Sequence, residues 1–198
     1  MQGFESTWGI LEKIKYANSI NSNELIRLIS KEESIYSQNS IRTAHRDLYT
    51  LEHIDDKKIF DLIGIRLKER QDSLIKQLAI ILPGNPTKYF RNYLVFCEEC
   101  ISSGHHHSLF HQFLIFNECP YHERGLIHLC KNCNRKIPYT LTNDYSFQCC
   151  CGFSLITGVS VANFNKWNKY RNPEIIHEKI INWLILNKKN ENSNILFD

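Results

Sequence analysis

All eight cysteines of this 198-residue chain lie between positions 97 and 151, and none lies in residues 1–96 or 152–198. Clustering of that kind indicates a local framework, made either of disulfides or of metal ligands. The amino terminus, MQGFESTWG, has no basic patch followed by an apolar run, so we expect no export. Cysteines in a reducing compartment are more often metal ligands than disulfides. We therefore predict metal sites, with zinc as the ion.

The cysteines and one histidine form four close pairs along the chain. The first three pairs have two intervening residues, and the last has one and is followed by a glycine. Such short spacing lets a tight turn point both side chains at one ion, so each pair can supply one edge of a tetrahedron. Four pairs predict two structural Zn²⁺ sites per chain, with the ligands Cys97, Cys100, Cys119, His122, Cys130, Cys133, Cys149 and Cys151.

Two features of this pattern leave alternatives. The pairs can combine sequentially, first with second and third with fourth, or in the cross-braced order of RING domains, first with third. The seven residues between His122 and Cys130 exceed the usual RING spacing, which favours the sequential order. The last pair is ambiguous because Cys149, Cys150 and Cys151 are contiguous. Either Cys149 is the ligand and Cys150 is a free thiol, or Cys150 is the ligand and Cys149 is left over.

The motifs favour structural over catalytic zinc. A catalytic zinc keeps an open position for water, whereas both predicted sites already have four protein ligands. No cysteine follows a proline, as a deaminase would require, and His122-Glu123 has no second histidine at the metalloprotease spacing. We therefore predict that the protein is not an enzyme. A zinc hydrolase or nuclease is the least favoured alternative.

A run of three histidines, His105 to His107, lies close to His111 and resembles a further metal site. No carboxylate stands beside the run at ligand spacing. We therefore predict that these histidines bind no metal and are solvated or cap the next element.

The pattern before the cysteine block is helical. Three short segments have apolar residues at helical spacing: one capped by Ser6 or Thr7, one opened by Asn21 or Ser22, and one starting near Ser40. Three such helices in succession resemble a helix-turn-helix arrangement. No stretch approaches the roughly 18 uninterrupted apolar residues of a membrane helix.

A fourth apolar segment, from Leu74 to Ile81, stops at Pro83-Gly84-Asn85-Pro86, a sequence that cannot continue a helix. This boundary predicts a fold that is mainly α with small irregular zinc-ribbon modules. The three predicted regions are a helix-turn-helix-like region at 1–86, tandem zinc modules at 87–157 and a C-terminal helical segment at 158–198.

The amino-terminal helices are one candidate contact surface for DNA, and the C-terminal segment contains another, for nucleic acid or a partner. Trp167 and Tyr170 alternate there with Lys166, Lys169 and Arg171, and these side chains could contact phosphates and stack on bases. The alternative, which we favour, is an amphipathic helix that buries the aromatic rings.

The charge balance also disfavours an independent nucleic-acid binder. The formal net charge is only +3. Seven ligand thiolates and two Zn²⁺ ions together add a charge of −3, so the formal charge of +3 falls to zero on metal binding.

The chain resembles the TniQ family, which includes the target-selecting proteins of bacterial transposons. The amino-terminal part of the resemblance is Glu5-Ser6-Thr7-Trp8, followed by Ala17-Asn18. The zinc block has the family's order of motifs, and the match covers about residues 4 to 155. The motifs are Cys97-Glu98-Glu99-Cys100, Cys119-Pro120-Tyr121-His122, Cys130-Lys131-Asn132-Cys133 and Cys149-Cys150-Cys151-Gly152, of which the Cys-Pro-x-His motif is the most specific.

The resemblance implies a non-enzymatic adaptor for DNA transposition in the bacterial cytoplasm. TniQ-like proteins mark the insertion site and pass it to an AAA+ ATPase regulator, which recruits the transposase. In CRISPR-associated systems they also contact the RNA-guided effector. The expected partners are therefore the ATPase, target DNA, an effector complex and a second copy of the chain, with no membrane. The alternative is a zinc-containing DNA-binding transcription regulator.

Overall fold

The computed structural model describes residues 4–32, 47–81, 85–141 and 144–156. Helices predominate in this part of the chain, and two short strands form a small sheet. The prediction of a mainly α chain is confirmed to that extent. The segment 158–198 lies outside the described residues, and with it the predicted contact residues Lys166, Trp167, Lys169, Tyr170 and Arg171.

The first two helices begin where the sequence predicts. Helix α1 (Thr7–Asn18) is capped by Ser6, whose Oγ accepts a hydrogen bond from the Gly9 N–H at 3.0 Å. Helix α2 (Ser22–Ile29) starts with a capping box, in which Asn21 and Glu24 each accept a hydrogen bond from the other's backbone N–H. Local capping chemistry therefore positions both helices.

The next helices differ from the pattern. The third predicted helix is described only from residue 47, as α4 (Asp47–Thr50). Helix α5 (Asp56–Ile63), which the sequence did not predict, is capped by Asp55 and ends at Gly64, whose φ of 70° suits glycine. Helix α6 (Leu67–Ile81) begins seven residues before the predicted start at Leu74.

The cysteine-rich half contains little regular structure. A 3₁₀ turn, two short helices and two strands occur among loops: η1 (Pro86–Tyr89), β1 (Tyr93–Leu94), α7 (Glu98–Gly104), α8 (Leu109–Gln112) and β2 (Ile137–Pro138). The strands pair antiparallel, with Tyr93 opposite Pro138 and Leu94 opposite Ile137.

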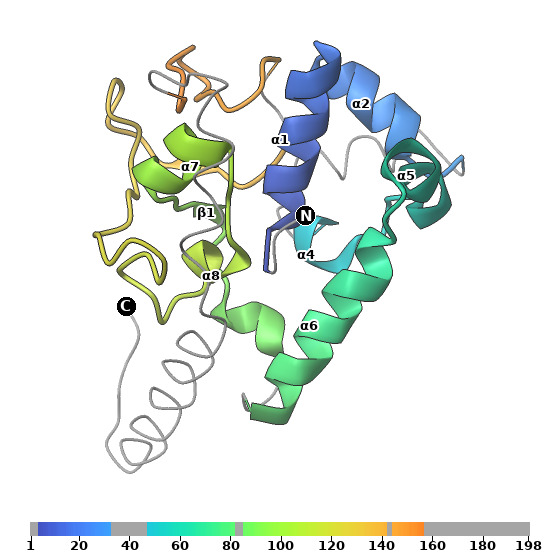
Figure 1. Cartoon of the computed structure of the whole chain (residues 1–198), viewed down its shortest axis with the longest axis horizontal. Helices are drawn as coiled ribbons and strands as arrows, with labels where there is room; N and C mark the ends of the chain where they lie inside the picture. The colour runs from blue at the N-terminus through green and yellow to red at the C-terminus, as the bar shows by residue number, and fades with distance from the viewer. Residues whose placement is uncertain (1–3, 33–46, 82–84, 142–143, 157–198) are drawn as a thin grey trace.

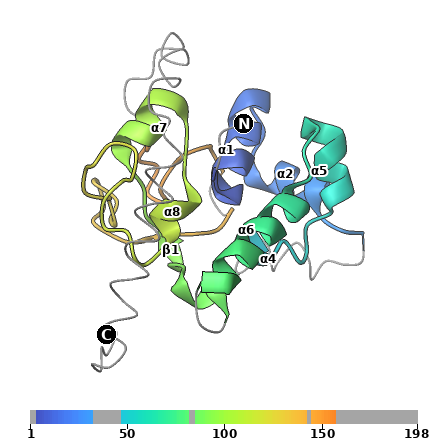
Figure 2. The same ribbon diagram turned by 60° about the horizontal axis from the view of Figure 1, so that its bottom comes forward.

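Helix α1 lies between the two halves of the molecule. Figure 1 shows α2, α5 and α6 on one side of α1 and α7, α8 and β1 on the other, and the view in Figure 2 has the same order. One cluster of buried apolar residues includes Leu11 from α1, Ile59 from α5 and Tyr139 beyond β2. The helical half and the cysteine-rich half therefore share a core across α1.

The N-terminal segment pairs with the loop between α7 and α8. Ser6 donates its backbone N–H to the His107 carbonyl at 2.8 Å, and Leu109 donates to the Phe4 carbonyl at 2.7 Å. The Trp8 indole meets the His107 ring at 5.1 Å and the Phe147 ring at 5.6 Å, both edge to face. The start of α1 is thereby held against residues that lie between the cysteine pairs.

A buried ion pair connects α1 to the loop before the last cysteines. Lys15 Nζ lies 2.9 Å from Glu12 Oε1 and donates to Ser22 Oγ at 3.0 Å, while Glu12 Oε2 accepts from the Phe147 N–H at 2.6 Å. Burial raises the pKa of Glu12 even though Lys15 and the Phe147 N–H act against that rise. A buried ion pair of this kind adds little net stability, because the cost of removing both charges from water offsets their attraction.

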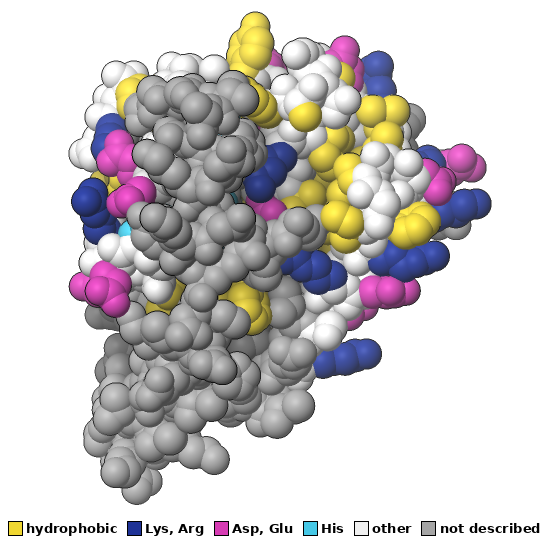
Figure 3. Space-filling view, viewed as in Figure 1, with side chains coloured by type: hydrophobic (Ala, Val, Ile, Leu, Met, Phe, Trp, Pro, Cys, Tyr) yellow, Lys and Arg dark blue, Asp and Glu magenta, His cyan; other side chains and the backbone are white. Residues whose placement is uncertain are grey.

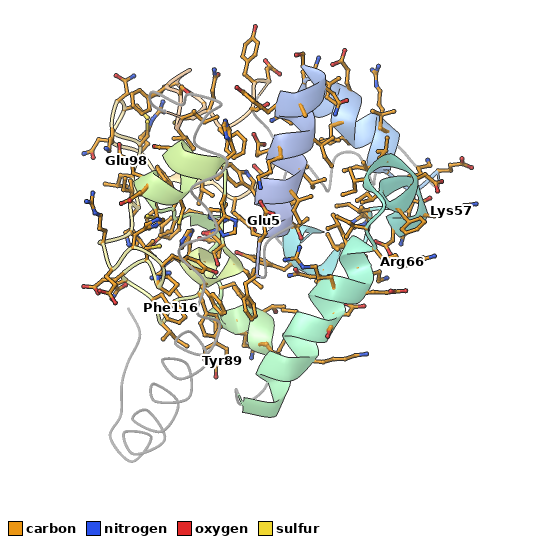
Figure 4. The ribbon with its side chains drawn as sticks, in the orientation of Figure 1. Glu5, Lys57, Arg66, Tyr89, Glu98 and Phe116 are labelled. Carbon is orange, nitrogen blue, oxygen red and sulfur yellow. The ribbon has the colours of Figure 1, made fainter. Side chains whose placement is uncertain are left out.

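The side chains on the outer surface of α2 and α5 are partly apolar. Leu28, Phe60 and Leu62 are between 41% and 48% exposed, and yellow side chains gather on this side of the molecule in Figure 3. Arg66 lies over the Phe60 ring at 4.9 Å, and Figure 4 shows Lys57 and Arg66 at the edge of the same region.

None of the helices in the described residues combines the length and the apolar character that a membrane-spanning helix requires.

Gly9 provides a test of the contact between α1 and the cysteine-rich half. A Cβ added at Gly9 would lie 3.0 Å from His107 Cβ and 3.3 Å from the His107 backbone. We expect Gly9→Ala to lower the free energy of unfolding by about 1–2 kcal/mol, because an overpacking cost of about 1–3 kcal/mol exceeds the gain of up to about 1 kcal/mol in helix propensity. The measurement is urea unfolding followed by circular dichroism.

The matched control for this variant is Gly125→Ala, since a Cβ at Gly125 meets nothing within 4 Å. That change should stay within about 0.5 kcal/mol of wild type. A Gly9→Ala protein as stable as wild type, or more stable, would show that α1 does not depend on this close approach.

Candidate metal centres

The first donor group combines α7 with a tight turn. Cys97 is the residue before α7 and Cys100 lies in its first turn, so the helix itself sets their spacing. Cys119 and His122 lie in a turn closed by two backbone hydrogen bonds, from the Cys119 N–H to the Arg124 carbonyl at 2.7 Å and from the Glu123 N–H to the Cys119 carbonyl at 2.9 Å. The three cysteines are buried.

The donor atoms of this group fit a single ion. All four lie within 4.8 Å of one another. The Sγ atoms of Cys100 and Cys119 are 3.6 Å apart, and His122 Nδ1 lies 3.5, 3.2 and 3.6 Å from the sulfurs of Cys97, Cys100 and Cys119. The edges of a tetrahedron with metal–sulfur bonds of about 2.3 Å and a metal–nitrogen bond of about 2.0 Å are about 3.5–3.8 Å long.

His122 presents Nδ1 to the sulfurs, and its other ring nitrogen faces a carboxylate. Nε2 lies 3.9 Å from Glu99 Oε1, and Arg124 holds the other Glu99 oxygen at 3.4 Å. A carboxylate behind a ligand histidine orients the ring and raises its basicity. Burial acts to lower the pKa of His122, but its contacts with the sulfurs of Cys119 and Cys97 outweigh burial and raise the pKa to about 10.

The second donor group is built from two similar turns. The first runs from Cys130 to Arg135 and repeats the hydrogen bonds of the turn at Cys119, with the Cys130 N–H donating to the Arg135 carbonyl and the Asn134 N–H to the Cys130 carbonyl, both at 2.9 Å. The second closes from Gly152 N–H to the Cys149 carbonyl at 2.8 Å. Gly152 has a φ of 82°, which explains the glycine after the last cysteine.

The four sulfurs of the second group also meet around one point. They lie within 4.8 Å of one another, and two of the Sγ–Sγ distances, Cys130 to Cys151 and Cys133 to Cys149, are 3.7 Å. Hydrogen bonds to the Cys151 sulfur, chiefly from the Phe153 N–H and secondly from the Asn132 side-chain amide, lower the pKa of Cys151 to about 6. The lowered pKa favours the thiolate form, which is the form that binds metals.

The structure brings the predicted ligands together in sequential order. The first group contains the first two pairs and the second group contains the last two, rather than the cross-braced combination. Cys149 lies in the second group, whereas Cys150 is exposed and its sulfur is 3.9 Å from that of Cys149. The two groups could bind two metal ions, and each would cross-link segments that are far apart in the chain.

The histidine run is buried, so the prediction that it is solvated is wrong. His105, His106 and His107 are at most 2% exposed. His107 donates its Nε2–H to the Val95 carbonyl at 2.9 Å, and its Nδ1 accepts a hydrogen bond from the Ser6 hydroxyl at 2.6 Å. Burial lowers its pKa to about 3, so the ring is neutral. His105 instead ends α7 as its C-cap, with a φ of 52°, whereas the prediction has the run cap the element that follows; that helix, α8, is capped by Ser108.

These histidines pack around the N-terminal segment because its polar atoms need partners. Glu5 is 3% exposed, its Oε1 lies 3.6 Å from His106 Nδ1, and it also pairs with Lys13. Figure 4 shows Glu5 at the base of α1, facing the cysteine-rich half. A pattern of sequence spacing does not reveal such contacts, because Glu5 and His106 are 101 positions apart.

His111 lies beside the first donor group, although sequence spacing gave no reason to connect it with the cysteines. Its side chain is fully buried, with Nε2 3.4 Å from Cys119 Sγ and 3.8 Å from Cys100 Sγ. Burial holds the pKa of His111 well below its usual value.

No protein-family model matches the chain, and no curated protein matches it either.

The contiguous cysteines give a direct test of the second donor group. Cys149→Ser should reduce metal content from two ions per chain to one, because its sulfur is one of the four in the group. Cys150→Ser is the matched control and should keep two ions, since Cys150 is exposed and outside the group. Native mass spectrometry of both variants, purified without chelator, provides the measurement. Loss of an ion from Cys150→Ser with retention in Cys149→Ser would reverse the assignment.

Proposed function

We propose that each donor group binds one Zn²⁺ ion and that both ions are structural. Three thiolates with one imidazole, and four thiolates, are the donor sets that tetrahedral zinc prefers. The donor distances described above fit such a tetrahedron. All four positions are taken by protein atoms in each group, so neither site offers the open position that hydrolytic chemistry needs.

Metal removal tests this role. Stripping the protein with a strong chelator should cost at least about 5 kcal/mol and lower the Tm by about 10–20 °C, because zinc binding contributes folding free energy directly. Two equivalents of Zn²⁺ should restore the wild-type Tm, as measured by calorimetry. Cys119→Ser should bind one ion instead of two and have a lower Tm than the wild-type protein. A chelator-treated protein with an unchanged Tm would contradict a structural role for the metal.

We further propose that the chain is a TniQ-like adaptor for DNA transposition, linking a marked target site to an AAA+ ATPase regulator and its transposase. The observation that carries this proposal is the contact between the two parts of the resemblance. Ser6 and Trp8, from the amino-terminal motif, touch His107 and Phe147, which lie among the cysteine motifs. The two parts of the resemblance, 90 or more residues apart in the chain, therefore pack together in one folded unit. Such packing supports the idea that they form a single family motif rather than two unrelated matches.

Charge and surface composition support a protein-binding role. The formal net charge falls from +3 to zero when seven thiolates bind two Zn²⁺ ions, so no strong attraction to nucleic acid remains. The partly apolar outer side of α2 and α5 is typical of proteins that bind other proteins. In this proposal, the marked target site is recognised either through target DNA or through an RNA-guided effector.

A pull-down with the AAA+ ATPase encoded beside the gene tests the adaptor role. The immobilised zinc-loaded protein should retain the ATPase in the presence of DNA and a non-hydrolysable nucleotide. The chelator-stripped protein and bare resin are the controls, and both should retain much less. No retention under any combination of DNA and nucleotide would contradict the adaptor. Sequence-specific DNA binding without any ATPase, in a gel-shift assay, would favour the transcription regulator instead.

A further inference from the structure

His111 on α8 is held in one orientation by a backbone group. Ser108, the residue that caps α8, donates its backbone N–H to His111 Nδ1 at 3.3 Å, completing a capping box in which histidine takes the place of the usual glutamate or glutamine. An atom that accepts this hydrogen bond cannot carry a proton. In the neutral ring the proton is therefore on Nε2.

The Nε2–H of His111 points at two sulfurs of the first donor group. Cys119 Sγ is 3.4 Å away and Cys100 Sγ is 3.8 Å away, the range of hydrogen bonds to sulfur. The remaining faces of the ring meet the His107 ring at 5.3 Å and the Tyr121 ring at 6.4 Å, both edge to face. Among the contacts described for His111, the two sulfurs are the nearest acceptors for the Nε2–H.

The same geometry argues against His111 as a ligand. Binding a metal through Nε2 would move the proton to Nδ1, where it would face the Ser108 N–H, a second donor. The four-donor group is also complete without His111.

We propose that His111 is a positioning residue that donates a hydrogen bond to the thiolates of Cys119 and Cys100 and thereby slows loss of metal from the first site. Three thiolates around a divalent ion leave one negative charge in a buried place. An N–H donor spreads that charge and makes the sulfurs poorer acceptors for the protons that drive metal release. The second site, whose described contacts include no histidine, serves as the reference within the same molecule.

This inference depends on the proposed Zn²⁺ binding, and two substitutions test it. His111→Phe keeps the volume and removes the donor. His111→Gln keeps a donor, because glutamine at this capping-box position can accept from the Ser108 N–H with its oxygen and donate to sulfur with its nitrogen. Both proteins are loaded with two equivalents of Zn²⁺, and ion release to a chromophoric chelator is followed in time. The phase absent from Cys149→Ser identifies the second site.

We expect about 10- to 100-fold faster release from the first site in His111→Phe, because removing an outer-shell partner typically lowers metal affinity by about that factor. His111→Gln should release the ion at close to the wild-type rate. Release from the second site should be unchanged in both. In Co²⁺-loaded protein, the sulfur-to-cobalt charge-transfer band of the first site should shift in His111→Phe and return towards wild type in His111→Gln.

Other results would overturn the role of His111. Wild-type release from His111→Phe would mean that no hydrogen bond matters there. Equal acceleration in both variants, with equally lowered Tm and no band shift, would mean that the ring only fills space. Failure of the wild-type protein itself to hold two ions would instead contradict the proposed zinc binding, so the two failures are distinguishable.

Discussion

The convergence of thiols into two small groups is the constraint on which the cysteine-rich half depends. Each group places four donor atoms within 4.8 Å of one another, and at that distance several thiolates repel unless a cation lies between them. Little regular secondary structure is available to hold these loops, because the local sheet has only two-residue strands. Two bound metal ions, as proposed above, would explain how long irregular segments between residues 97 and 156 form buried structure.

Helix α1 extends that constraint to the helical half. Its cap Ser6, its aromatic residue Trp8 and its buried pair Glu12 and Lys15 all contact segments that run between donor pairs. The helix also packs against α2, with Lys15 bonded to Ser22. The donor groups and the N-terminal helices are therefore linked through one element, and the close approach at Gly9 leaves little room for α1 to shift.

Much of the local structure was predictable because local chemistry determines it. Ser6 and Asn21 start helices through hydrogen bonds to residues three positions away, and Gly152 permits the last turn. Helix α5 escaped prediction although four of its eight residues are apolar and Asp55 caps it, because eight residues are fewer than the window of about 11–18 residues over which helical periodicity is read. The early start of α6 escaped because its first turns are mostly polar.

The sequence alone determined which side chains can bind metal, because the spacing inside each pair acts over two or three residues and needs no tertiary structure. Only the tertiary structure decided which pairs form one donor group, that Cys149 rather than Cys150 joins the second group, and that the histidine run is buried. It also placed His111 beside Cys119. These features depend on contacts between residues that packing around α1 brings together. Such contacts join residues far apart in the chain, so they produce no spacing pattern that could be recognised in the sequence.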